Sequence, residues 1–82
     1  MDYSIIALKI GNREGTAQLI QGILTEYGCL IKVRLGLHNL PPDACSPLGL
    51  VLMEVVGEAK ELEAMLAKLN AVPDAVAKLV RL

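Results

Sequence analysis

Aromatic side chains are almost absent from this sequence, which contains two tyrosines and no phenylalanine or tryptophan. Small α+β domains that bind RNA stack the bases on aromatic residues of their central strands. An excess of positive charge is also missing, since the formal net charge is −1 at pH 7, whereas nucleic-acid-binding domains carry a basic patch. We therefore expect no direct binding to DNA or RNA.

Cysteine is equally scarce, and the two residues present, Cys29 and Cys45, do not make a disulfide framework. The N-terminus lacks the basic region and apolar run of a signal peptide. The apolar segment Ile5–Ile10 is far shorter than the roughly 20 residues that a membrane-spanning helix needs. These absences predict a cytoplasmic protein with reduced thiols and no membrane association.

Aliphatic residues, in contrast, are abundant. Hydrophobic residues make up 54% of the 82 residues, and charged residues only 21%. A chain of this length forms one domain, here residues 1–82, and buries only about 60% of its unfolded surface. Its apolar content is more than one small core can hide. We therefore expect some apolar surface to lie in a homo-oligomeric interface, in a dimer or a tetramer.

The spacing of apolar residues alternates between the two-residue period of strands and the 3.6-residue period of helices. Helical spacing predicts one helix from Thr16, its expected N-cap, to Tyr27 before the helix-stopping Gly28, and a second over Glu58–Asn70. Extended segments precede, separate and follow these helices, namely Tyr3–Ile10, Leu30–His38, Leu48–Val56 and Ala75–Leu82.

The predicted order β-α-β-β-α-β indicates a ferredoxin-like α+β fold. It has a four-stranded antiparallel sheet with both helices on one face. The first and third strands are apolar on both sides, so we expect them at the centre of the sheet.

Strict alternation within the second strand predicts that Ile31, Val33, Leu35 and Leu37 face the core. The open face of the sheet is then expected to carry Ile5, Ala7, Lys9, Lys32, Arg34, Gly36, His38, Leu50, Leu52 and Glu54. Because aliphatic residues occupy its centre, we expect the homo-oligomer to form through the sheet, either face to face or edge to edge.

The segment Gly11–Thr16 leads from a strand into a helix N-terminus. Backbone N–H groups at such a position bind anions, and two glycines allow a ligand to approach closely. Arg13 could add a bidentate contact, although an ordinary capped β–α connection explains the same residues. Under the binding interpretation the site consists of Gly11, Asn12, Arg13, Gly15 and Thr16, with Arg34 and His38 from the second strand.

Three residues are candidate ligands for a transition metal. Thiolate and imidazole groups bind Zn, Ni or Cu, so His38 and Cys45, with Cys29 as a further candidate, form a hypothetical metal site completed across an interface. The alternative is a buried Cys29, a free Cys45 in a loop and a surface His38. A nucleophilic Cys45–His38 pair needs hydrogen-bond contact that spacing alone does not indicate. We therefore expect a protein that is not an enzyme and has no resident cofactor.

Glycines and aliphatic residues recur in an order that resembles the ACT-domain pattern. A strand is followed by GNREGTAQLIQGILTEYG, with a glycine opening the first helix and another near its end, and then by a strand ending in RLGLH. The segments KVRLGLHN, GLVLMEVVG and LNAVPDAVAKLV are similar to small stand-alone ACT-like proteins described as iron-only hydrogenase system regulators. They are also similar to the ligand-binding domain of the nickel-responsive repressor. The resemblance covers nearly the whole chain.

This resemblance implies a non-catalytic regulatory domain that oligomerises through its sheet and binds a small effector, often an amino acid, between subunits. It places the effector loop at Gly11, Asn12, Arg13, Glu14, Gly15 and Thr16. If the similarity to the nickel-responsive repressor extends to its metal, His38 and Cys45 are the candidate ligands. A purely structural interaction module is the remaining alternative.

Overall fold

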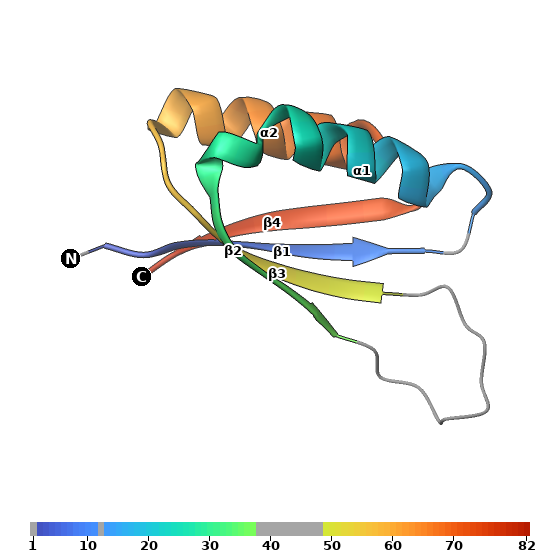
Figure 1. Cartoon of the computed structure of the whole chain (residues 1–82), viewed down its shortest axis with the longest axis horizontal. Coiled ribbons are helices and arrows are strands. Elements are labelled where there is room, and N and C mark those ends of the chain that lie inside the picture. Colours follow the sequence, from blue (N-terminus) through green and yellow to red (C-terminus); the bar gives the residue numbers. More distant parts are fainter. Residues whose placement is uncertain (1, 12, 38–48) are drawn as a thin grey trace.

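The computed structural model describes residues 2–11, 13–37 and 49–82 of the chain. Four strands form one antiparallel sheet in the order β2-β3-β1-β4, and two helices cover one of its faces (Figure 1). This is the expected ferredoxin-like α+β arrangement, with β1 and β3 at the centre. The elements are β1 (Ser4–Ile10), α1 (Thr16–Glu26), the short 3-10 helix η1 (Gly28–Leu30), β2 (Ile31–Leu37), β3 (Gly49–Val55), α2 (Ala59–Ala71) and β4 (Ala75–Arg81).

The helices begin at local signals in the sequence. Before α1, Gly15 has φ 86°, a left-handed conformation that favours glycine. Thr16 is the first helical residue and not the N-cap that the sequence predicts, because its hydroxyl donates to the carbonyl of Pro73 at 2.9 Å. Helix α2 begins with a capping box, in which the Glu58 N–H donates to the Glu61 carboxylate at 3.2 Å.

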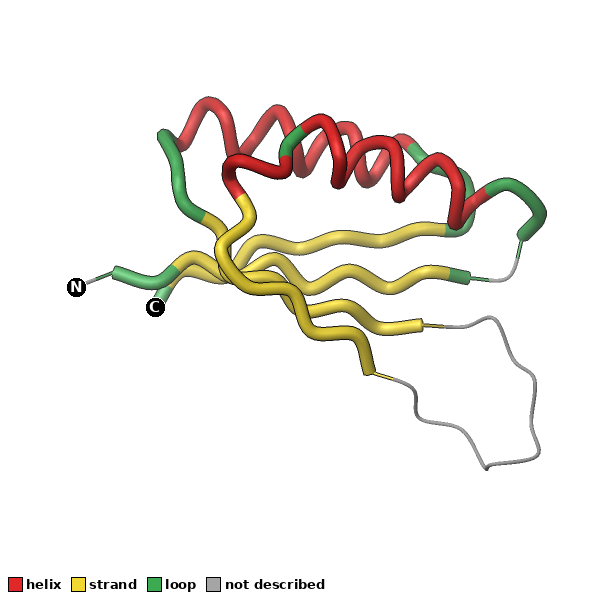
Figure 2. Tube along the Cα trace, viewed as in Figure 1, coloured by secondary structure: helices red, strands yellow, loops and turns green. Residues whose placement is uncertain are grey.

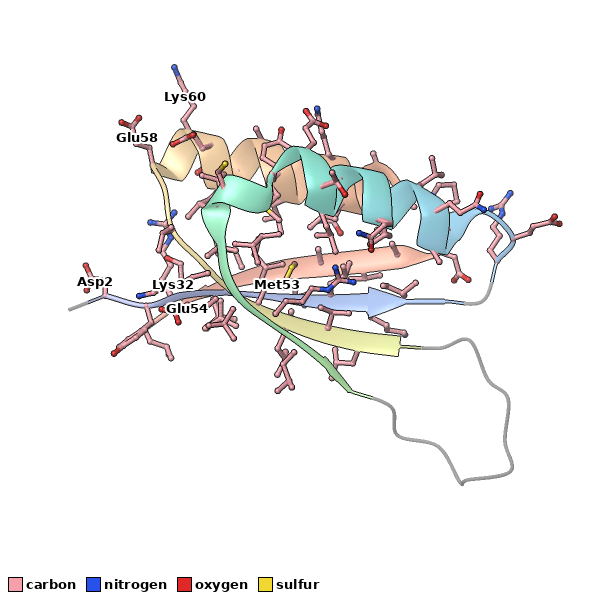
Figure 3. The ribbon with its side chains drawn as sticks, in the orientation of Figure 1. Asp2, Lys32, Met53, Glu54, Glu58 and Lys60 are labelled. Atoms are coloured by element: carbon pink, nitrogen blue, oxygen red, sulfur yellow. The ribbon has the colours of Figure 1, made fainter. Side chains whose placement is uncertain are left out.

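The hydrophobic core lies between the helical layer and the sheet (Figure 2). Met53 points from β3 toward the helices (Figure 3) and, like Met65 of α2, is fully buried. The buried hydrophobic residues are Ile6, Leu8, Ile20, Leu24, Val51, Met53, Val55, Leu62, Met65, Leu69, Val72, Ala75 and Ala77.

An ion pair joins the two helices on their outer side. Lys68 Nζ lies 2.7 Å from Glu26 Oε2 and 5.3 Å from the centre of the Tyr27 ring. The hydrogen bond that Lys68 donates to the Glu26 carboxylate raises the pKa of Lys68 above its ordinary value. In the described residues, neither helix is long and apolar enough to cross a membrane.

Strand β2 contains a β-bulge that the sequence pattern did not predict. Ile31 pairs with Val55, but Val33 already pairs with the neighbouring Glu54. Lys32 is therefore an extra residue in the ladder. One extra residue reverses the face on which all later side chains of a strand lie.

The predicted orientation of β2 is consequently wrong after the bulge. Leu35 lies opposite Leu52 on the open face, and Val33 shares that face two residues before it. Arg34 lies opposite the buried Met53, so Arg34 and Gly36 are on the helix side and not on the open face. Both remain exposed because β2 is at the sheet edge.

Candidate functional site

The loop between β1 and α1 is bonded to the turn that precedes β4. The N–H of Gly11 donates to the carbonyl of Asp74 at 2.8 Å, and the N–H of Arg13 donates to the Asp74 carboxylate at 3.0 Å. The Thr16 hydroxyl bonds to Pro73 in the same turn. The carboxylate at this loop is therefore supplied by the chain itself, where an anionic ligand was expected.

Gly11 has a packing role at this contact. It is buried, and a Cβ atom at this position would overlap the carboxylate of Asp74. Asp74 has φ 65°, a left-handed conformation that aspartate adopts more readily than most residues. These contacts fit the alternative that the sequence left open, in which the segment is a capped β–α connection.

The hydrogen bonds between the loop and the turn before β4 do not enclose the predicted site residues Arg13 and Gly15 in a pocket. Arg13 and Gly15 are exposed, and a Cβ atom at Gly15 would have nothing within 4 Å, so its φ of 86° is the reason for a glycine. Asn12 lies outside the described residues.

Arg34 is a loosely held cation at the junction of β2 and α1. Its Nη1 and Nη2 atoms each lie 3.5 Å from Oε1 of Gln21 in α1, at the long limit of a hydrogen bond. Both side chains are exposed. A guanidinium in this state keeps its capacity for a bidentate contact with a carboxylate.

The structure does not bring Arg34 and the glycine loop of one subunit together. Arg34 lies opposite Met53, which lies opposite Ile6, four residues before the end of β1 at Ile10. With a rise of about 3.3 Å per residue and strands about 4.8 Å apart, the separation is roughly 13 Å along the strands and 10 Å across them. A joint site within one chain is therefore not formed.

The predicted metal ligands His38 and Cys45 lie outside the described residues, so this hypothesis stays a prediction. Cys29 is exposed in η1, contrary to the expectation of a buried thiol at a strand start. Within residues 2–11, 13–37 and 49–82, no three histidine, cysteine, aspartate or glutamate side chains are grouped closely enough to hold a metal ion.

The main surface feature is the open face of the sheet, and the bulge makes it more apolar than the alternation in β2 predicted. Val33 and Leu35 are both 53% exposed there. Nine large hydrophobic residues of the described chain are exposed, and all except Leu19 of α1 belong to the strands or directly flank them. These eight residues are Tyr3, Val33, Leu35, Leu50, Val56, Val76, Val80 and Leu82.

Charged residues are few on this open face. Register places Lys9 beside Leu50, Lys78 beside Ala7, and Glu54 beside Ile5. The high aliphatic content was the signal in the sequence for such a surface. The bulge, which adds Val33 and Leu35 to it, had no signal of its own.

Comparisons with known proteins support the fold. No protein-family model matches the chain, and no curated protein matches its sequence. The structure is similar to that of the uncharacterized protein TM1266 from Thermotoga maritima, with a TM-score of 0.83 and 17% sequence identity. The match covers 100% of this chain and 99% of that one. At this identity the similarity establishes the ferredoxin-like α+β fold alone.

Proposed function

We propose that this protein is a non-catalytic, ACT-like regulatory domain of the cytoplasm that works as a homo-oligomer held through the open face of its sheet. The observation that carries the proposal is the concentration of exposed aliphatic side chains on that face. Monomeric proteins rarely expose contiguous apolar patches larger than a few hundred Å².

The size of the face matches that of the largest apolar patch on a typical monomer, which is often functional. Four strands about 4.8 Å apart and seven residues with a rise of about 3.3 Å give a flat area of roughly 19 by 23 Å, or about 440 Å². The largest patch on a typical monomer is about 300–600 Å² and is often functional. This area favours an interface.

A second copy of the chain is the occupant that the charges favour. In β1, β3 and β4 the face carries Lys9, Lys78 and Glu54, a net charge near +1 from two positive and one negative side chains. The exposed Lys32 lies at the bulge in β2. Two such faces repel each other only weakly, and neither a strongly acidic nor a strongly basic partner finds a complementary field. Sheets that pack face to face, about 10 Å apart, bury residues of this aliphatic kind.

The proposed effector is a small molecule with a carboxylate, bound at a subunit boundary through Arg34. The glycine loop is a weaker candidate, because Asp74 already accepts the N–H of Arg13. Arg34, in contrast, is exposed and has only the two long contacts with Gln21. Its position on an edge strand leaves the guanidinium accessible to both a ligand and a neighbouring subunit.

The oligomer is tested by the molar mass in solution of the wild type and of a Val76→Glu/Val80→Glu variant. Both substitutions place a carboxylate on the open face, at strand β4, and we expect the variant to form a smaller species. The control is Ala64→Glu/Ala67→Glu, which adds the same charge to the exposed side of α2 and keeps the wild-type mass. Equal masses for both variants would contradict an interface on this face.

The effector site is tested by thermal unfolding with a panel of amino acids and other small carboxylates. We expect at least one compound to raise the melting temperature of the wild type and of an Arg13→Ala control. The shift is absent in Arg34→Ala. A shift that survives in Arg34→Ala places the site elsewhere.

A further inference from the structure

The side chain of Asn70, in the last turn of α2, takes the place of a neighbouring strand at the β4 edge of the sheet. Its amide donates to the carbonyl of Ala77 at 2.9 Å and accepts from the N–H of Ala77 at 2.8 Å. In an antiparallel ladder, a strand bonds to its partner in the same way, by exchanging both bonds with a single residue. Asn70 therefore uses both backbone groups that an added strand would need at Ala77.

The backbone groups of Ala77 point outward because of the alternation of antiparallel ladders. Tyr3 and Leu82 exchange two hydrogen bonds, of 3.1 and 2.8 Å. In the register of β1 and β4, the even-numbered residues of β4 therefore bond to β1, and the odd-numbered residues direct their N–H and C=O groups away from it. The residues of β4 with outward groups are Ala75, Ala77, Leu79 and Arg81.

The sequence of β4 gives this edge a tendency to pair with other chains. Residues 75–80 read AVAKLV, in which Lys78 is the only charge. Apolar segments of about six residues with high β-propensity and no proline pair readily when they lie at a sheet edge. A lysine on an edge strand opposes such pairing, and Lys78 is exposed. The first half of the strand carries no charge, and Asn70 is bonded to this half.

We propose that Asn70 protects the β4 edge, and that without its amide β4 pairs antiparallel with β4 of a second copy. While Asn70 is bonded to Ala77, a second copy can reach outward groups only in the second half of the strand. Once the amide is removed, the N–H and C=O of Ala77 lose their partners, which is unfavourable until another strand replaces them. This protection is independent of the proposed function, because it concerns the backbone of β4 and not the effector or the open face.

An axis at Leu79 is the two-fold arrangement that the strand favours. An axis at Lys78 sets two ammonium groups opposite each other, which destabilises a strand pair. An axis at Ala77 requires the N–H of Ala75, which is already bonded within the chain. With the axis at Leu79, Ala77 exchanges both hydrogen bonds with the partner's Arg81, so the pairing depends on the groups that Asn70 holds.

The two bonds of Asn70 also tie α2 to β4, and a purely structural role makes a different prediction. Loss of a tie lowers the stability of the fold without creating a contact in a defined register. Loss of edge protection makes the folded variant associate through β4. The experiments below separate these outcomes.

Sedimentation of an Asn70→Leu variant tests the protection itself. Leucine is close to asparagine in size but bonds to neither backbone group of Ala77, so we expect a larger molar mass than that of the wild type at the same concentration. The control Leu66→Ala lowers stability through the core, against which Leu66 packs, and keeps the wild-type mass. Equal association of both variants would identify instability as the cause and overturn the proposal. Circular dichroism confirms that each variant is folded.

Disulfide cross-linking tests the register. Chains with Lys78→Cys are mixed with chains with Val80→Cys, both in a background without the two native cysteines. Across an axis at Leu79, these positions form a non-hydrogen-bonded pair with Cα atoms about 4.5 Å apart, within the range of disulfides. We expect Asn70→Leu to raise the rate of linkage between unlike chains at least about tenfold over chains that keep Asn70. Equal rates would overturn the pairing.

Proline at position 81 provides a rescue that a structural tie does not predict. The N–H of Arg81 points away from β1, so Arg81→Pro removes no bond of the sheet but removes the donor to the partner's Ala77. We expect Asn70→Leu/Arg81→Pro to return to the wild-type mass and linkage rate, whereas Arg81→Pro alone changes neither. Association that persists in the double variant would contradict pairing through β4.

Discussion

The two faces of the sheet are built from similar residues and differ in what covers them. In β3, Val51 and Met53 are buried under the helices, whereas Leu50, on the other side of the same strand, is 40% exposed and Leu52 is only partly buried. The covered face holds the chain together. The open face has the same aliphatic character, but no helices of the chain cover it. An apolar strand composition therefore indicates that both faces favour burial, and it does not indicate what buries each face.

The largest expected effect comes from the covered face. Met65→Ala leaves a cavity in the core and should lower the free energy of unfolding by about 2–5 kcal/mol. Met65 is fully buried. Leu50→Ala, a change of similar size on the open face, should alter the stability of the dissociated chain by no more than about 0.5 kcal/mol.

Urea denaturation at a concentration where the wild type is dissociated measures both values. Met65→Leu conserves volume and is the milder control, with an expected loss below about 1.5 kcal/mol. Similar losses for Met65→Ala and Leu50→Ala would break the distinction between the two faces.

A smaller effect is expected at the glycine loop beside the covered face. Gly11→Ala forces its Cβ atom against the Asp74 carboxylate and should destabilise the fold by about 1–3 kcal/mol. In an Asp74→Ala background the same substitution should be tolerated better, because the obstructing carboxylate is gone. A double-mutant cycle measures the coupling, expected at roughly 0.5–3 kcal/mol. Additive effects would show that the loop is not held by this contact.

The smallest effect is expected for the ion pair on the outer side of the helices, where Lys68 and Glu26 are about half exposed. Because the folded-state pKa of Lys68 is raised, the contribution is fully present below the ordinary pKa of 10.5. It is lost as the pH rises through the folded-state value.

Thermal unfolding should therefore show a slight destabilisation by Glu26→Gln at pH 7 that fades above pH 10.5. Glu63→Gln, a change of the same kind on α2, is the control. A difference between wild type and Glu26→Gln that is independent of pH would exclude this ion pair as the cause.

Much of the fold could be predicted from the sequence. The spacing of apolar residues identifies each helix and strand, and the glycines and prolines that interrupt it mark the ends, so both signals are local. The second strand was predicted over Leu30–His38 and is observed over Ile31–Leu37. The predicted ends of both helices lie within two residues of the observed ends. The facing of β2 could not be predicted. A bulge at Lys32 adds one residue without any change in the alternating pattern.

The site was less accessible to sequence reasoning for a different reason. Asp74 reaches the loop from 61 residues beyond Arg13, and no local spacing reports such a contact. Arg34, predicted as a ligand-binding residue of the open face, is exposed but lies on the helix side of the edge strand. Its binding role stays a prediction. The hypotheses on Asn12, His38 and Cys45 remain predictions.

The molar mass of the wild-type protein across concentration, measured by sedimentation, tests most directly whether the open face joins copies of the chain. The account predicts a species of two or four chains, 17.6 or 35.2 kDa as a multiple of 8.8 kDa, that dissociates on dilution. A mass of 8.8 kDa at every concentration up to about 1 mM would contradict it, because even weak association is detected at that concentration.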